Sequence, residues 1–453
     1  MNVVAIFDIG KTNKKVFLFN ENYQIVWEKS VNLRETLDED GFTCEDIVEL
    51  KNWIVNRLAE MQALKEYFLK AINFSTYGAS FVYIDENGKA LTPLYNYLKE
   101  YPEVLKKEFY GKYKGEESFA LKTASPVLGS LNSGMQIYRL KEENPDLFAK
   151  VKYCLHLPQY LSSLLTGKYF ADITSIGCHT NLWNFKKMKY HKWIKKENIG
   201  DKIPPLHNAE NTINVSGGIA VGVGLHDSSS AIIPYMINFT EPFVLLSTGT
   251  WSISMNPFNE TPLTFDEMQY DCLCYLQYKK KPVKAARLFA GNEHEVQTKK
   301  LASHFGVPLD TYKQVLYDKK IISKLREINL KKYSSKVNKY KILRESPFGK
   351  RNLGDFENYE IAYHQLLLDI IAQQIISTQL VIHNSPVKKV FVDGGFSKNS
   401  IFMNLLAEAF PEMEVYAASM AQASALGAAL AIHNNWNPKP IQNDLIDLKF
   451  YKH

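Results

Sequence analysis

Apolar and polar positions alternate along the first thirty residues in the way that short β-strands require. Val3–Ile9 is apolar apart from one aspartate, Lys15–Phe19 alternates, and Gln24–Glu28 follows a polar stretch. Runs of this kind, bounded by small and polar residues, predict strands joined by tight turns. We therefore expect the chain to open with three short strands.

A helical period replaces this alternation further along the chain. In Glu45–Leu69 apolar residues recur every three to four positions with charged residues between them, which predicts a helix. Ala71–Phe74 and Phe81–Asp85 return to strand-like patterns. Leu98–Val151 is charged and periodic and is expected to be largely helical, and Tyr153–Leu165 ends at a Thr-Gly-Lys helix stop.

The same order of patterns restarts near the middle of the chain. Phe243–Ser247 is apolar, a Thr-Gly-Thr turn follows, and Trp251–Met255 alternates again. Beyond them the pattern predicts the long helix Tyr359–His383, the strand Val387–Val392, the helix Asn399–Ala409, the strand Val415–Ala417 and the small-residue helix Ala421–His433. This repeat of topology predicts an α/β protein with two domains, residues 1–237 and 238–453, and a cleft between them.

Length and composition agree with this division and narrow the functional classes. A chain of 453 residues exceeds the roughly 250–300 that one core supports. A net charge of only +6, with lysines in short runs, argues against a nucleic-acid partner. No apolar run approaches the roughly 18 residues of a membrane span, so no membrane partner is expected. Five scattered cysteines and a first segment unlike a signal peptide favour the cytoplasm.

The turn after the first strand has the composition of an anion site. Asp8 ends a buried strand and is a candidate for holding hydrated Mg²⁺. The residues after it, Gly10 to Asn13 with Lys15, would offer backbone N–H groups and positive charge to an anion. Gly10-Lys11-Thr12 resembles the end of a P-loop, but the upstream glycine is missing and a strand follows, which excludes Walker A. An ordinary hairpin remains the alternative interpretation.

Two further glycine turns occur in the second half. Thr248-Gly249-Thr250 combines a close backbone approach with two hydroxyl donors. Asp393-Gly394-Gly395, followed at the next helix by Asn399, would let a ribose or purine lie on the backbone. Each of these turns alone also fits a plain connection between elements.

An acidic residue interrupts the small and apolar stretch 222–231. Asp227 lies near the expected domain junction and is a candidate general base. His226 beside it is interpreted as a packed or hydrogen-bonded neighbour rather than a second catalyst.

Taken together and in order, these four blocks resemble the FGGY carbohydrate kinases of the actin, Hsp70 and sugar-kinase superfamily. The blocks are Asp8–Lys15, Gly224–Asp227, Leu246–Ser252, and Asp393–Asn399 with Ala421–Ala429. The resemblance implies two RNase-H-like (actin-like ATPase) domains, with ATP and Mg²⁺ in a central cleft, and phosphorylation of a sugar hydroxyl.

Residue by residue, the resemblance implies Asp227 as general base and Asp8 as support for the metal. It implies ATP contacts from Gly10, Lys11, Thr12, Asn13, Lys15, Thr248, Gly249, Thr250, Gly394, Gly395 and Asn399. Lys15 stands where many members have arginine, which keeps the charge and loses the bidentate fork. Lys11 is bulkier than the usual small residue.

The sugar is expected to be a ketose. The segments Ser247–Ser252 and Ser75–Ser80 resemble rhamnulokinases and fuculokinases, which implies a 6-deoxyketose such as L-rhamnulose or L-fuculose phosphorylated at a primary hydroxyl. Candidate substrate residues are Thr76, Tyr77, Gln136 and His226, with Tyr77, Tyr83 and Tyr97 available to pack on a deoxysugar. The alternatives are a xylulokinase-like or ribulokinase-like pentulose kinase and a non-catalytic ATP-binding sensor. A homodimer is left open.

Overall fold

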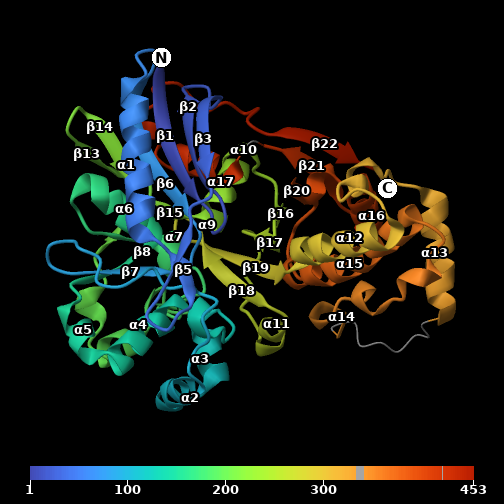
Figure 1. Ribbon diagram of the computed structural model, residues 1–453, viewed down its shortest axis with the longest axis horizontal. Coiled ribbons are helices and arrows are strands. Elements are labelled where there is room, and N and C mark those ends of the chain that lie inside the picture. The colour runs from blue at the N-terminus through green and yellow to red at the C-terminus, as the bar shows by residue number, and fades with distance from the viewer. Residues whose placement is uncertain (333–340, 421, 453) are drawn as a thin grey trace. The chain divides into compact units, whose positions relative to one another are not determined.

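The computed structural model describes residues 1–332, 341–420 and 422–452, and its chain divides into two compact units (Figure 1). The first unit consists of Met1–Asn238, Cys274–Pro282 and Ala421–Leu445. The second consists of Phe239–Leu273, Val283–Met420 and Ile446–His453. Both units mix helices with a sheet, which confirms the α/β class. The units are discontinuous along the chain, and the division at residues 237 and 238 stays a prediction.

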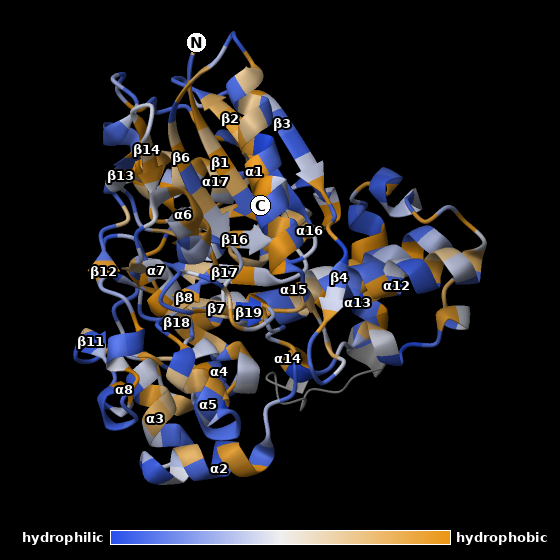
Figure 2. Cartoon of the chain, turned by 60° about the vertical axis from the view of Figure 1, so that its left-hand side comes forward, coloured by the Kyte–Doolittle hydropathy of each residue, from blue (hydrophilic) through white to orange (hydrophobic). Residues whose placement is uncertain are grey.

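A seven-stranded sheet forms the centre of the first unit. Its order is β13-β14-β6-β1-β2-β3, and β15 also pairs with β6. The strands are β1 Asn2–Ile9, β2 Lys14–Asn20, β3 Ile25–Val31, β6 Phe68–Thr76, β13 Thr212–Val215, β14 Ile219–Gly222 and β15 Leu225–His226. β1 runs antiparallel to β2 and parallel to β6, which sets Asp8 opposite both Lys15 and Ser75. In Figure 2 the central strands β1, β2 and β6 are largely apolar, as strands covered on both faces of a sheet require.

Helices and short strands complete the first unit. Its helices are α1 Ile47–Ala63, α2 Glu103–Lys112, α3 Glu116–Thr123, α4 Ser133–Glu143, α5 Pro145–Lys150, α6 Leu157–Thr166, α7 Ile173–Ile176, α8 Lys192–Lys196, α9 Asp227–Ala231, α10 Ile233–Asn238 and α17 Ala423–Ala431. Its short strand pairs are β4 Glu35–Leu37 with β5 Thr43–Glu45, β7 Phe81–Ile84 with β8 Tyr153–His156, β9 Ala171–Asp172 with β12 Leu206–His207, and β10 Trp183–Asn184 with β11 Lys189–Tyr190.

Two of the predicted helices are too long. The helix predicted over Glu45–Leu69 ends at Ala63, because the Phe68 N–H bonds to the Met1 carbonyl and β6 begins there. The predicted helix Tyr153–Leu165 opens with the four residues of β8, which pair with β7. Pro158 then lies in the first turn of α6, the helix position that tolerates proline.

The other seven-stranded sheet, most of whose residues belong to the second unit, has the order β18-β19-β17-β16-β20-β21-β22. Its strands are β16 Phe243–Thr248, β17 Ser252–Asn256, β18 Cys272–Leu276, β19 Pro282–Leu288, β20 Lys389–Gly394, β21 Glu414–Ser419 and β22 Asp447–Tyr451. Its helices are α11 Phe265–Gln269, α12 Ala290–Phe305, α13 Lys319–Lys332, α14 Lys341–Arg344, α15 Tyr359–Ile382 and α16 Ser400–Ala409. β16 runs antiparallel to β17 and parallel to β20, as β1 does with β2 and β6.

α15 is the long helix that the sequence predicts over Tyr359–His383. Among the described residues it is the one helix long and apolar enough to cross a membrane by length and composition. In the structure 72% of its apolar window is buried within the protein. Its Gln374 and Thr378 side chains form hydrogen bonds with the Ser252 and Ser254 hydroxyls of β17, so the helix packs on the sheet.

α17 is attached to the first unit by close backbone contacts. The Asn73 amide of β6 donates to the Ala428 carbonyl at 2.8 Å. A Cβ atom added at Gly427 would lie 1.9 Å from the Ser230 carbonyl oxygen of α9. The absence of a side chain at Gly427 therefore sets the spacing between α9 and α17. Ala421, the first residue of the predicted small-residue helix, lies outside the described residues.

Because a Cβ at Gly427 would overlap backbone, Gly427→Ala is expected to destabilise the protein by about 1–3 kcal/mol. Gly111 in α2 is the matched control, since nothing lies within 4 Å of its added Cβ. Gly111→Ala is expected to stabilise the helix by about 0.5–1 kcal/mol. Urea unfolding measures both values, and equal stabilities of the two variants would contradict the contact.

Candidate active site

Asp8 is the carboxylate around which the first unit gathers polar groups. It lies near the end of β1, and the strand register places Lys15 on one side and Ser75 on the other. The Ser424 hydroxyl, just inside α17, donates to Asp8 Oδ2 at 2.9 Å. Groups from β1, β2, β6 and α17 thus meet at one carboxylate.

The electrostatic environment of Asp8 is unusual for an aspartate. Burial raises the pKa of the Asp8 carboxyl to about 6, and the negative charge of Asp227 adds to this effect. The Ser424 hydrogen bond, the Lys15 ammonium and the Ser75 hydroxyl lower the same pKa and only partly offset the burial. Two carboxylates therefore influence each other here, and a cation nearby would relieve their repulsion.

Asp227 follows β15 directly and begins α9. Its Oδ1 accepts hydrogen bonds from the Ser228 N–H at 2.6 Å and the Ser228 hydroxyl at 3.3 Å. The side chain is 36% exposed, so a small molecule has access to the carboxylate. A partly solvated carboxylate held by its neighbouring residue has the geometry of a proton acceptor.

His226 is packed, as the sequence suggested. Its Nε2 lies 3.1 Å from Cys178 Sγ and 3.2 Å from Asp227 Oδ1. Burial lowers the pKa of His226, and the Asp227 charge acts against this shift. A Cβ added at Gly78 would lie 2.8 Å from His226 Cδ2, so glycine at that position makes room for the imidazole. The ring is thereby fixed beside Asp227.

The other predicted substrate residues lie in the same unit as Asp227 and His226. Thr76 is paired with His226 across the strands, and its hydroxyl donates to the Tyr77 carbonyl. The rings of Tyr77 and Tyr97 have centroids 6.0 Å apart. Gln136 donates to the Ala79 and Ser130 carbonyls, while its Oε1 is buried with no hydrogen-bond partner in the structure. The expectation for Tyr83 was wrong, because this side chain is fully buried in a hydrophobic core.

The first turn is compact, and its lysines already have partners. The Gly10 N–H donates to the Asn13 carbonyl at 3.0 Å, while Thr12 and Asn13 are exposed. Lys11 forms an ion pair with Glu35 at 2.9 Å, which directs its charge toward a carboxylate of the same unit. Lys15 reaches the Gln422 Oε1 at 3.4 Å. Lys11 is thus paired with Glu35, whereas Lys15 lies opposite Asp8 in the strand register.

In the second unit two glycine turns are joined by Thr248. Its hydroxyl donates to the Asp393 carbonyl and accepts from the Phe396 N–H, and its carbonyl accepts from the Gly395 N–H at 2.7 Å. Gly394 has φ +87°, and a Cβ there would lie 2.0 Å from the Thr248 carbonyl oxygen. The Thr248 hydroxyl is thus engaged within the unit, and exposed Gly249, Thr250, Gly394 and Gly395 form the accessible surface.

Asn399 has a structural role that its sequence context did not reveal. Its Oδ1 caps α16 by accepting from the Ile401 and Phe402 N–H groups, each at 3.0 Å. Its Nδ2 donates to the Tyr363 hydroxyl at 2.7 Å, and His294 Nε2 lies 2.9 Å from the same hydroxyl. Tyr363 and His294 come from two separate helices, α15 and α12, so spacing in the sequence gives no sign of them.

The described residues contain no group of three or more His, Cys, Asp or Glu side chains placed to hold a metal ion. Mg²⁺ usually needs only one or two carboxylates, with waters and substrate phosphates as its other ligands. The buried Asp8, with its raised pKa and the Ser75 and Ser424 hydroxyls beside it, fits that kind of site. Cys272 and Cys274 are both buried in β18.

The sequence model of the FGGY family of carbohydrate kinases, N-terminal domain, matches residues 3–231. The chain belongs to this family. Two C-terminal domain models of FGGY carbohydrate kinases match residues 240–323 and 362–433. The matched N-terminal segment contains both Asp8 and Asp227.

Curated relatives of this FGGY chain include two rhamnulokinases. That of Mannheimia succiniciproducens is 26% identical over 277 residues, which are 58% of this chain and 55% of the relative. That of Oceanobacillus iheyensis is 26% identical over 260 residues, or 54% of each chain. The chain spans about half the length of the curated relatives that it matches.

Solved structures show that the fold is that of FGGY kinases. A carbohydrate kinase from Novosphingobium aromaticivorans superposes with a TM-score of 0.77 at 22% identity, covering 99% of this chain and 96% of that one. A xylulose kinase from Lactobacillus acidophilus superposes with a TM-score of 0.79 at 14% identity, covering 100% and 94%. The two-domain actin-like ATPase fold expected from the sequence is therefore confirmed.

Burial of Asp8 predicts a characteristic pH dependence of stability. Its folded-state pKa of about 6 exceeds the ordinary 3.8, so the folded chain binds more protons than the unfolded chain between these values. The Asp8 contribution to stability thus becomes less favourable as pH rises through this window. In metal-free buffer Asp8→Asn is expected to be more stable than wild type at pH 8, by up to about 3 kcal/mol, with little difference below pH 4.

Urea unfolding at several pH values measures this difference. Asp444→Asn, at an exposed position of the same unit, is expected to show the wild-type pH dependence. An Asp8→Asn variant less stable than wild type at pH 8 would contradict the assignment of burial as the dominant effect on Asp8.

Proposed function

We propose that this protein is an ATP-dependent sugar kinase that phosphorylates a primary hydroxyl of a ketose, with Asp227 as the general base. The observation that carries the proposal is the accessible Asp227 carboxylate beside the fixed His226 ring, at the strand edge that also holds Asp8. Membership of the FGGY family supports this assignment.

Asp227 would accept the proton of the sugar hydroxyl as its oxygen attacks the γ-phosphorus of ATP. The new O–P bond forms as the bond to the ADP oxygen breaks, and ADP leaves with the electron pair of that bond. The Ser228 N–H and hydroxyl hold the carboxylate in place. His226 would contact the sugar and limit the movement of Asp227, since Gly78 and Cys178 fix its ring.

Phosphate binding is proposed for the turn of each unit. In the first unit the donors would be the backbone of Gly10–Asn13, including exposed Thr12 and Asn13, with the Lys15 ammonium; Lys11 would first have to leave Glu35. In the second unit they would be Gly249 and Thr250. Thr248 would act by holding the turns, because its hydroxyl and carbonyl are bonded to the segment 393–396.

The adenosine would lie on Gly394 and Gly395, where the missing side chains expose the backbone. Asn399 would support this surface indirectly, as the N-terminal cap of α16, because its amide nitrogen already donates to the Tyr363 hydroxyl. Asp8 would hold Mg²⁺, and the ion when bound neutralises charge on the phosphates being transferred. Asp8, Ser75 and Ser424 provide only oxygen groups, the donors that Mg²⁺ prefers.

A 6-deoxyketose, L-rhamnulose or L-fuculose, is the proposed substrate. The Tyr77 and Tyr97 rings have centroids 6.0 Å apart and would pack on the methyl group, mainly through Tyr97, because Tyr77 is only 8% exposed. Thr76 and Gln136 would position the sugar, and the unpartnered Gln136 Oε1 is available as an acceptor. The rhamnulokinase relatives support this substrate class. A cytoplasmic location, the absence of nucleic-acid and membrane partners, and a possible homodimer stay predictions.

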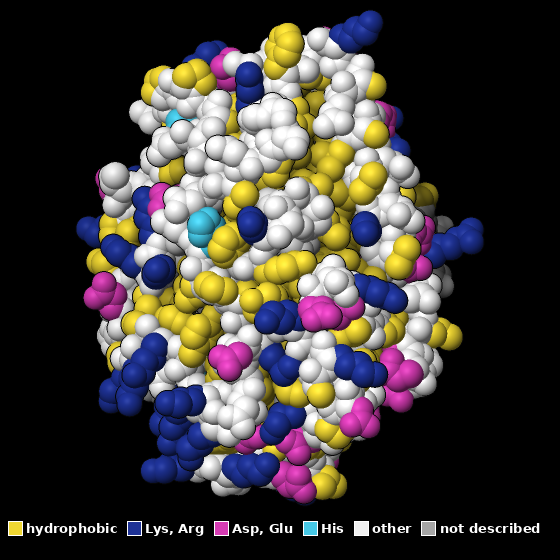
Figure 3. Space-filling model, turned by 90° about the vertical axis from the view of Figure 1, so that its left-hand side faces the viewer, with side chains coloured by type: hydrophobic (Ala, Val, Ile, Leu, Met, Phe, Trp, Pro, Cys, Tyr) yellow, Lys and Arg dark blue, Asp and Glu magenta, His cyan; other side chains and the backbone are white. Residues whose placement is uncertain are grey.

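One face of the molecule carries a mixture of charged and apolar side chains. Figure 3 shows basic, acidic and apolar side chains interspersed over most of one face, with Lys and Arg gathered toward one lower corner. A continuous basic stripe, which binding of a nucleic-acid backbone requires, does not cross this face.

An ATP-coupled assay with L-rhamnulose, L-fuculose, D-xylulose and L-ribulose tests the proposal. We expect turnover with a 6-deoxyketose and little with glycerol. Asp227→Asn is expected to lower kcat by about 10²–10⁴ because the proton acceptor is lost, while ATP affinity stays near that of wild type. Calorimetry with ATP measures the affinity.

Asp201→Asn provides the matched control, since this aspartate of the first unit is exposed and lies outside the proposed site. It is expected to retain wild-type kcat. Preference for a pentulose would correct the substrate class, and ATP hydrolysis that no sugar stimulates would favour the ATP-binding sensor. Unchanged kcat in Asp227→Asn would remove Asp227 from the role of base.

A further inference from the structure

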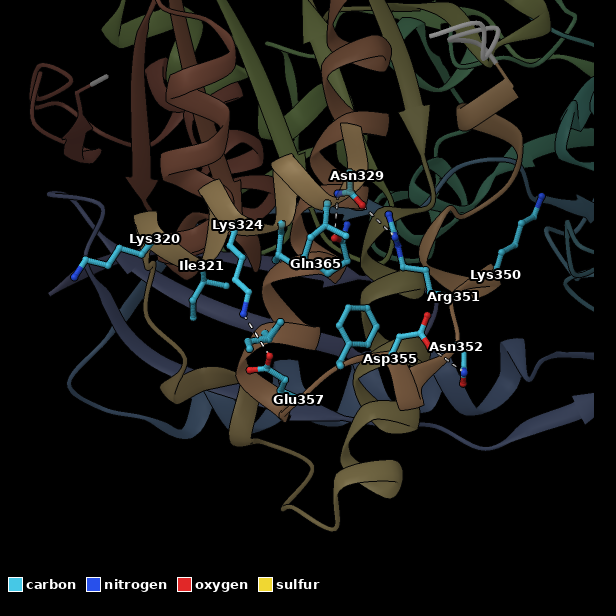
Figure 4. A pocket seen from close by; sticks show the side chains of 14 residues that line it. Lys320, Ile321, Lys324, Asn329, Lys350, Arg351, Asn352, Asp355, Glu357 and Gln365 are labelled. Carbon is cyan, nitrogen blue, oxygen red and sulfur yellow. Dashed lines mark hydrogen bonds and ion pairs between the residues drawn. The ribbon is translucent and has the colours of Figure 1, made fainter. Parts of the chain in front are cut away.

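A pocket of about 490 Å³ lies within the second unit and shares no residue with the motifs of the proposed kinase site (Figure 4). Residues of α13 form one wall, the stretch Lys350–Glu357 forms the opposite wall, and Ile361 and Gln365 of α15 contribute the floor. The volume falls in the roughly 300–1,000 Å³ range of small-molecule sites.

One part of the pocket is apolar. Ile321, Leu325 and Ile328 follow one another along α13 at the spacing of a single helix face. Phe356 and Ile361 complete the apolar lining from the other elements. Ile328 keeps 40% of its surface exposed although it lies on this face, so the apolar wall is accessible to a ligand.

A fixed polar network forms the other part. The Arg351 guanidinium makes a bidentate ion pair with Asp369 and also donates to Asn329 Oδ1 at 3.3 Å. The Asn329 amide in turn donates to Gln365 Oε1 at 3.1 Å. Figure 4 shows Asn329, Gln365 and Arg351 close together in the pocket lining. Because these hydrogen bonds fix the Asn329, Arg351 and Gln365 side chains, the polar part of the pocket is already in place before a ligand binds.

Lys324 is the cation placed to receive an anionic group. In Figure 4 its side chain extends into the pocket, whereas Lys320 and Lys350 point outward at the two ends. Its contact with Glu357 is 3.3 Å long, and the two side chains are 60% and 72% exposed. Exposed ion pairs of this kind contribute little, so a ligand anion can replace Glu357 at low cost.

We propose that this pocket binds a small organic anion, with its phosphate or carboxylate at Lys324 and a compact apolar body between α13 and Phe356. A bare inorganic ion would leave the apolar wall unused, and a neutral apolar molecule would make no use of the Lys324 charge, which would keep only its exposed pairing with Glu357. A molecule that carries both an anionic group and an apolar body would contact both Lys324 and the apolar wall.

The walls of the pocket also connect to the adenosine motif of the same unit. The segment before α13 is bonded to two other helices: the Tyr317 N–H donates to Ser400 Oγ and the Asp318 N–H to His364 Nε2, each at 3.1 Å. Ser400 directly follows Asn399, and His364 follows Tyr363. A ligand at this site therefore touches α15, which contains Tyr363, and α13, whose preceding segment is bonded to Ser400 beside Asn399.

Fluorescence of 1-anilinonaphthalene-8-sulfonate, an aromatic sulfonate, tests the proposal on the whole protein. We expect saturable binding and displacement by phenyl phosphate at concentrations about tenfold lower than inorganic phosphate or benzyl alcohol require. Equal displacement by all three compounds, or no saturable binding of the probe, would overturn the proposal. The measurement needs no kinase turnover and stands apart from the proposed function.

Variants locate the site. Lys324→Gln and Ile328→Gln are each expected to weaken binding of the probe by about threefold or more, through the charge and the apolar contact respectively. Lys299 is 61% exposed and also paired with a glutamate, and Val296 is 38% exposed, both on α12. Lys299→Gln and Val296→Gln are expected to bind as wild type. If both pocket variants bind as wild type, or the controls weaken equally, the pocket is not the site.

Discussion

Backbone pairing along β6 is the constraint on which the first unit depends. β6 is parallel to β1, which sets Asp8 opposite Ser75, and parallel to β15, which sets His226 opposite Thr76. The adjacent residues Ser75 and Thr76 of β6 therefore set the positions of Asp8 and His226, although these two lie more than two hundred residues apart in the chain. Because these strands are parallel, their carboxyl ends meet at one edge, and the functional groups gather there.

The same edge concentrates negative charge. Asp8 is buried among strands and α17, and Asp227 begins a helix that is more accessible. Their different surroundings suit different tasks: a buried carboxylate that gains from a cation nearby, and a solvated one that can accept a proton. The close fit of Gly427 against Ser230 places Ser424 within reach of Asp8, so a packing contact also shapes the electrostatics.

Much of this arrangement could be predicted from the sequence, because strands and glycine turns leave local signals. The strands that hold Asp8, Thr248 and Gly394 were predicted to within two residues at each end, and the order of the motifs indicated the family. Contacts between distant segments leave no such signal. Ser424 donates to Asp8 although the two lie more than four hundred residues apart, and the Thr248 hydroxyl donates to the Asp393 carbonyl. Strand β8 was missed because Tyr153–His156 is as apolar as the helix that follows.

The central claim, that Asp227 receives the proton of the sugar hydroxyl, is tested most directly by a crystal structure with L-rhamnulose and a non-hydrolysable ATP analogue. The measurement is the distance from the reacting hydroxyl oxygen to the nearest Asp227 carboxylate oxygen. A separation of about 2.6–3.2 Å, with the hydroxyl facing the γ-phosphate, is the predicted result. A bound sugar whose primary hydroxyl lies beyond hydrogen-bond reach of Asp227, next to another acidic group, would contradict the account.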